Sequence, residues 1–154
     1  MAVIRARGDG HEGAELELGP SEREALANLV DQLEPLAASS PRVSPAAYPD
    51  AEQLEAEYRR LTGPDLEAAR SAALATVRRA LQETGPVSCL GRSDVEAWLR
   101  ACNALRVALA GEIGIHDDGW EDRLVPSDHA RPPYAALHAL GWIQQELLAV
   151  SPVD

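Results

Sequence analysis

The sequence predicts a mainly α-helical protein, a bundle of about five helices with a small N-terminal β-hairpin. Three observations predict this fold. Apolar and polar residues alternate over residues 3–7 and 14–18, which is typical of two half-buried strands. The later segments place apolar residues at helical spacing behind helix-start signals. A length of 154 residues suits one domain, 1–154, with the hairpin in 1–18 and the bundle in 21–150.

The hairpin can be assigned residue by residue. Arg5 and Arg7 are expected to face Glu15 and Glu17 on the solvent side. The side chains expected to cover the core are Ile4, Leu16 and Leu18. The intervening residues 8–13 spell G-x-G-x-x-G, a dinucleotide-binding pattern that requires a helix directly after the glycines. Because a strand follows here instead, we interpret these residues as a hairpin loop.

Start and stop signals divide the rest of the chain into five helices. The first begins at Ser21 and bends or ends at Pro35, and an irregular connection follows over 39–49. A short second helix from Asp50 is closed by residues 62–65, with three side chains expected inward: Leu54, Tyr58 and Leu61. The remaining expected elements are a third helix to about Thr84, stopped by Gly85-Pro86, a fourth from Ser93 to Ile113, a polar loop over 115–130, and a fifth after Pro132-Pro133.

The charge balance excludes several classes of function. The chain has 25 acidic residues against 14 basic ones, all arginine, so its net charge of −11 opposes binding to nucleic acid or to anionic membranes. We therefore expect direct nucleic-acid binding to be weak or absent. Since neither a signal peptide nor a long apolar run occurs, we expect no membrane association and a cytoplasmic location.

No motif of a catalytic or cofactor site is present, so we expect no enzyme activity, no cofactor and no metal site. The acidic residues 116–122 lack the alternating ligands and distal glutamate of an EF-hand loop. His129 has no partner at metal or triad spacing. We interpret this loop as a solvated acidic segment.

Three charged residues fall on helix faces that the pattern assigns to the interior: Glu57, Arg70 and Arg106; His138 is the candidate wall residue of a cavity between the helices. A buried guanidinium needs a carboxylate, so Arg106 is expected to be buried and paired with Glu57. Two interpretations stay open. The group is either an ion-pair network that fixes helix register or a small anion-binding cavity.

The two cysteines are expected to differ in reactivity. Cys89 falls in a predicted loop and is the candidate reactive thiol, whereas Cys102 lies well inside a helix. Their separation along the chain makes a bridge between them unfavourable in the native fold.

Three helical segments carry a family resemblance: EYRRLT (57–62), WLRACNALR (98–106) and LGWIQQ (140–145). The chain resembles, from about Ser21 to Leu148, an actinobacterial family associated with an oxidative-stress transcriptional regulator called AosR. The resemblance implies a non-enzymatic, cytoplasmic regulator of redox and cysteine-synthesis genes that contacts a stress sigma factor or RNA polymerase. Thiol sensing in that family needs paired cysteines, and the N-terminal segment here has none.

Two alternatives to this function remain open. The chain could be a helical module that senses a small anion through the interior arginines, or an adaptor associated with a Clp protease, since the resemblance also implies a gene near such an adaptor. Homo-oligomer formation is left open as well.

Overall fold

The computed structural model describes residues 2–115, 118–124, 127 and 131–150. In chain order its elements are β1 (Val3–Ala6), β2 (Ala14–Glu17), α1 (Pro20–Ser39), α2 (Glu52–Leu81), β3 (Val87–Leu90), α3 (Arg92–Glu112), the short 3-10 helix η1 (Asp118–Arg123) and α4 (Pro132–Val150). The mainly α-helical fold with an N-terminal hairpin is confirmed, with four α-helices among the described residues in place of about five. Among the described helices, none has the length and apolar character that a bilayer crossing requires.

The hairpin belongs to a three-stranded antiparallel sheet with the order β1-β2-β3. The strand β3, which was not predicted, lies between α2 and α3 in the chain and pairs with β2. One row of the sheet joins Ile4, Leu16 and Ser88, and all three side chains are buried against the helices. On the other face Arg5 donates hydrogen bonds to Glu15 and Glu17, each at 2.8 Å, as predicted.

The hairpin loop sets the partner of Arg7 and the conformation of Gly13. Arg7 pairs with Asp9 rather than with a glutamate of β2, because the loop brings that carboxylate closer. Gly13 has a φ of +120°, and a Cβ at this position would lie 2.0 Å from the carbonyl oxygen of Leu90. Only glycine fits this close approach between the end of the loop and β3.

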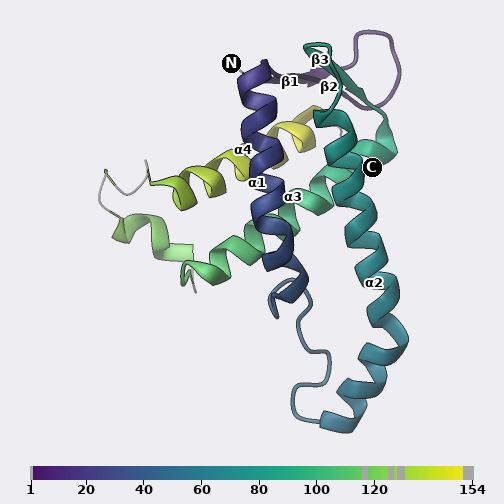
Figure 1. Cartoon of the computed structure of the whole chain (residues 1–154), viewed down its shortest axis with the longest axis vertical. Helices are drawn as coiled ribbons and strands as arrows, with labels where there is room; N and C mark the ends of the chain where they lie inside the picture. The colour runs from purple at the N-terminus through teal and green to yellow at the C-terminus, as the bar shows by residue number, and fades with distance from the viewer. Residues whose placement is uncertain (1, 116–117, 125–126, 128–130, 151–154) are drawn as a thin grey trace.

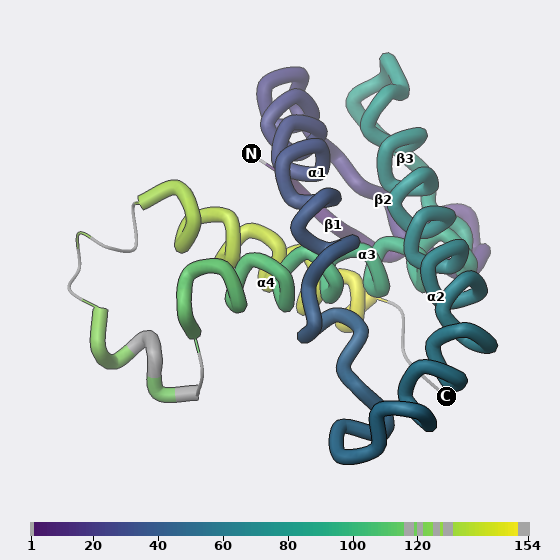
Figure 2. The backbone as a smooth tube through the Cα atoms, turned by 60° about the horizontal axis from the view of Figure 1, so that its bottom comes forward, coloured from purple at the N-terminus to yellow at the C-terminus, as the bar shows by residue number. Residues whose placement is uncertain are grey.

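The helix α3 lies at the centre of the bundle and contacts the other three helices. The helix α4 runs antiparallel beside α3, and α1 and α2 cross α3 (Figures 1 and 2). Trp98 of α3 is 1% exposed and lies in the common core. Five residues at helical spacing on α3 are buried: Val95, Trp98, Cys102, Leu105 and Leu109. The helix begins one residue before the expected start, and its Asp94 carboxylate accepts a 3.1 Å hydrogen bond from the N–H of Gly91.

The expectation of separate second and third helices was wrong, because α2 is one helix of 30 residues that contains Pro64. A proline inside a helix removes one backbone hydrogen bond and crowds the carbonyl four residues earlier. Here Pro64 is exposed, and a Cβ added at Gly63 would meet no atom within 4 Å from outside its own helical turn, so the local adjustment meets no packed core. Pro35 likewise does not end α1, which continues to Ser39.

The inward placement of the second predicted helix was also wrong. Leu54 is 57% exposed and Leu61 is 60% exposed, and Tyr58 is half-buried. Every buried residue of α2 lies at or after Ala73. Figure 1 shows the reason: the first half of α2 projects beyond the other helices, beside the connection over residues 40–51. We call residues 52–65 the α2 arm.

Candidate functional site: an arginine-lined groove

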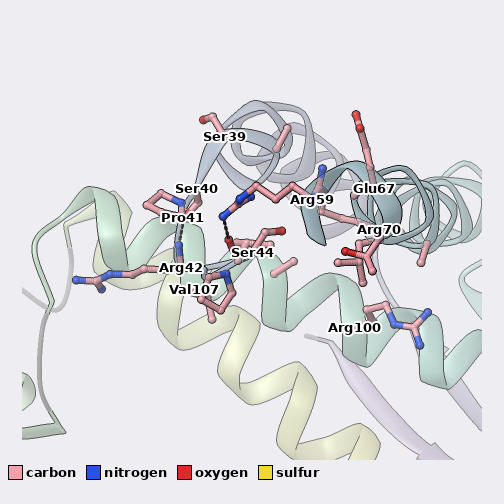
Figure 3. Close-up of a pocket in the computed structure, with 18 of the residues that line it drawn as sticks. Ser39, Ser40, Pro41, Arg42, Ser44, Arg59, Glu67, Arg70, Arg100 and Val107 are labelled. Carbon is pink, nitrogen blue, oxygen red and sulfur yellow. Dashed lines mark hydrogen bonds between the residues drawn. The ribbon is translucent and has the colours of Figure 1, made fainter. Parts of the chain in front are cut away.

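A groove of about 1010 Å³ runs between the end of α1, the following connection, α2 and α3. The end of α1 contributes Ala38 and Ser39, and the connection contributes residues 40–45. The other walls come from α2, between Tyr58 and Arg70, and from α3, between Arg100 and Val107. Figure 3 shows Arg42 and Ser44 on the connection, with the groove bounded by α2 and α3. The α2 arm forms one wall because the 40–51 connection folds back against it. Ala47 N–H donates to a carboxylate oxygen of Glu55 at 2.9 Å, and the rings of Tyr48 and Tyr58 meet edge to face at 5.9 Å.

Four arginines line this groove: Arg42, Arg59, Arg70 and Arg100. Arg42 donates to the carbonyl of Ile115 at 2.5 Å, and Arg59 donates to the carbonyl of Ser44 at 3.2 Å. Arg59 therefore joins two walls of the groove, α2 and the connection, whereas Arg42 joins the connection to the residue that follows α3 by three positions.

The other two arginines of the groove, Arg70 and Arg100, do not join its walls. Within the part of the chain that the structure describes, neither Arg70 nor Arg100 makes a hydrogen bond or an ion pair. Arg70 is half-buried and Arg100 is exposed. The acidic residue that lines the groove is Glu67.

The structure does not gather the four predicted interior residues into one network. Arg106 is exposed and donates a 2.5 Å hydrogen bond to Oε1 of Gln144, so its predicted burial and its pairing with Glu57 were wrong. The physical reason is helix phase: Arg106 lies at the edge of the α3 stripe, and its guanidinium extends over α4 beside Gly141. Glu57 is exposed on the α2 arm and pairs with Arg60 at 2.5 Å.

Three of the four predicted residues, Arg70, Arg106 and His138, line surface cavities and are not part of the core. Arg106 and His138 share a second cavity of about 380 Å³ between α3 and α4, and Arg70 lines the larger groove. The two cavities meet on α3, since Asn103 and Val107 line both. His116, Asp117 and His129 lie outside the described residues. Among the residues described, no three histidines, cysteines or acids gather as they would around a metal ion.

The sequence of residues 1–151 matches the model of a protein family described as "Domain of unknown function (DUF2017)". The chain belongs to this family. No match to the DUF2017 chain was found among curated proteins or among solved structures.

Sequence reasoning missed the buried charge of this DUF2017 chain, which is Arg23. Its side chain is 8% exposed and donates to the carbonyl of Ala80 at 2.8 Å and to Oγ of Ser88 at 3.0 Å. Ala80 is in the last turn of α2, whose free carbonyls carry partial negative charge that suits a cation. The signal was available, because Arg23 continues the buried stripe of α1 through Val30 and Ala37.

The cysteines occupy different environments. Cys102 is 3% exposed, and burial raises the pKa of its thiol to about 12, against the smaller opposing effect of the Arg106 charge. Cys89 is exposed, as predicted, but lies on the edge strand β3 rather than in a loop. Both thiols are free.

Proposed function

We propose that this protein is a non-catalytic regulator that binds a protein partner through the α2 arm. The observation that supports this most directly is the unusual exposure of the arm. Leu54 and Leu61 stand one heptad apart on one face of α2 and are 57% and 60% exposed. The 40–51 connection packs along another side of the helix and leaves these two leucines uncovered.

The energetics of the arm favour a partner. Most of the stability of helices in proteins comes from packing an apolar face, and the arm has no buried residue. Burying two such leucines contributes about 1–2 kcal/mol each, by area removed from water. A partner that covers this face would therefore gain affinity and stabilise the arm at once.

The identity of the partner is proposed from the resemblance and from charge. The likeness to the AosR-associated family points to a stress sigma factor or RNA polymerase, and to a role in transcription under oxidative stress in the cytoplasm. Surfaces that handle DNA are basic, and a chain with a net charge of −11 is attracted to them at long range. This argument favours a protein contact over direct binding to DNA.

A binding measurement with purified components tests this function. RNA polymerase holoenzyme containing the stress sigma factor should bind the wild-type chain, and Leu54→Ser/Leu61→Ser should weaken the affinity at least about tenfold. A matched control, Val3→Ser/Leu148→Ser, also removes two exposed apolar side chains but from outside the arm. Equal affinities of the arm variant and the wild type, or no binding of the holoenzyme at all, would contradict the proposal.

A further inference from the structure

We propose that the arginine-lined groove binds an acidic peptide segment that also carries an apolar side chain. The first observation is a local reversal of charge. The 21 residues that line the groove include four arginines and one acid, Glu67, whereas the whole chain has 25 acids and 14 arginines. A cationic groove in an acidic protein selects an anionic group at short range.

The second observation is that two of these arginines lack a bonding partner among the described residues. Several arginines elsewhere on the surface bind carboxylates of the chain itself; for example, Arg5 binds Glu15, and Arg78 binds Asp31 at 3.0 Å. Arg70 and Arg100 have no such partner among the described residues, although each guanidinium offers five donors in a planar fork that matches a carboxylate. Carboxylates from another chain would accept hydrogen bonds from both guanidinium groups.

The third observation is the apolar part of the lining, which a simple anion would leave uncovered. Leu66 is 50% exposed and lines the groove together with Val43 and Val107. These side chains come from α2, the connection and α3 respectively, so all three elements offer apolar surface to a bound segment. A volume of about 1010 Å³ also accommodates several side chains of a peptide rather than one small ion.

A peptide fits this charge distribution better than a nucleic acid. A nucleic-acid strand would extend its phosphates beyond the groove, over a surface whose total charge is −11. A short acidic segment keeps its carboxylates within the groove. At physiological ionic strength the Debye length is about 8 Å, so distant acids are screened while the adjacent arginines are not.

This inference rests on the proposed protein-binding role and adds the chemistry of one bound segment. The two can fail separately. The groove is tested with peptides and no sigma factor, whereas the α2 arm is tested with the polymerase holoenzyme and with leucine variants.

The test uses fluorescence anisotropy of a labelled short peptide that intersperses glutamates with single leucines, titrated with the full chain. We expect saturable binding of this peptide. A second peptide with glutamine at every glutamate should bind at least about tenfold more weakly, since it cannot form charge-assisted hydrogen bonds. Arg70→Gln/Arg100→Gln should reduce the affinity for the acidic peptide about tenfold.

The matched control is Arg60→Gln/Arg79→Gln, which removes the same charge from positions on α2 outside the groove. Its affinity should stay within about twofold of the wild type, because screening limits the influence of distant charges. Equal weakening by the two double variants would overturn the inference, as would equal binding of the glutamine peptide. Displacement of the peptide by inorganic phosphate, beyond the effect of chloride at equal ionic strength, would overturn it in favour of a small-anion site.

Discussion

Replacing Arg23 with methionine should lower the free energy of unfolding by about 2 kcal/mol. The side chain is 8% exposed and makes two hydrogen bonds, to Ala80 and Ser88. Hydrogen bonds from a charged donor contribute about 1.5–3 kcal/mol each, which gives about 3 kcal/mol at the low end. Methionine keeps the apolar stem in place, and it also removes the buried Nε, which has no partner and opposes folding by about 1 kcal/mol.

The low end applies because the partners of Arg23 are not left wholly unsatisfied. Ser88 Oγ itself donates to the carbonyl of Ala80 at 3.3 Å, and the N–H of Glu83 reaches the same oxygen at 3.3 Å. Urea unfolding followed by circular dichroism measures the change. Arg79→Met is the control, since Arg79 is exposed and, among the residues that the structure describes, bonds Thr76 alone, and its stability should lie within about 0.5 kcal/mol of the wild type. If Arg23→Met were as stable as that control, the guanidinium would not hold α2 to β3, and the reasoning would be refuted.

Four further outcomes follow from particular residues. Burial raises the pKa of the Cys102 thiol from about 9 to about 12, so the unfolded thiol ionises first and stability falls as pH rises. Urea unfolding at about pH 8 and about pH 10 should show a loss of about 1.4 kcal/mol that Cys102→Ala lacks; an equal loss in that variant would assign it to other groups. Thiol reagents should label Cys89 in the native protein and Cys102 only on unfolding, which mass spectrometry can follow; rapid native labelling of both would contradict the burial. Gly13→Ala should destabilise by about 2 kcal/mol or more, measured as a lower urea midpoint, since its Cβ would overlap the Leu90 carbonyl; an unchanged midpoint would exclude that clash. Pro64→Ala should restore a helical hydrogen bond and slow amide exchange in the α2 arm, whereas faster exchange would mean that proline stabilises it.

The sequence pattern predicted correctly those elements whose buried face is marked by the spacing of their own apolar residues. The alternation in the hairpin gave the pairing of Arg5 with Glu15, and the stripe on α3 gave Trp98 and its neighbours, because each pattern reports directly which face is buried. The strand β3 was missed since it has four residues and its pairing with β2 spans the whole of α1 and α2. Such a contact depends on tertiary arrangement rather than on local sequence.

The errors at the candidate site have one physical cause. Periodicity identifies an apolar face, but it does not say whether another element covers that face. Leu54 and Leu61 satisfy the helical spacing and remain exposed, since α2 extends past its neighbours. Arg106 lies at an edge of its stripe and bonds Gln144 of α4, a contact that periodicity alone does not report. The groove could not be predicted at all, because its walls come from three separate parts of the chain.

The central claim, that regulation runs through a protein partner, is tested most directly by fluorescence anisotropy on labelled promoter DNA at low salt. The isolated chain and the chain with the stress sigma factor are compared on the same DNA. With a net charge of −11, the isolated chain should bind weakly or not at all, and it should change the anisotropy only when the sigma factor is present. Tight, sequence-selective binding by the isolated chain at physiological salt would contradict the claim and make the protein a direct DNA binder.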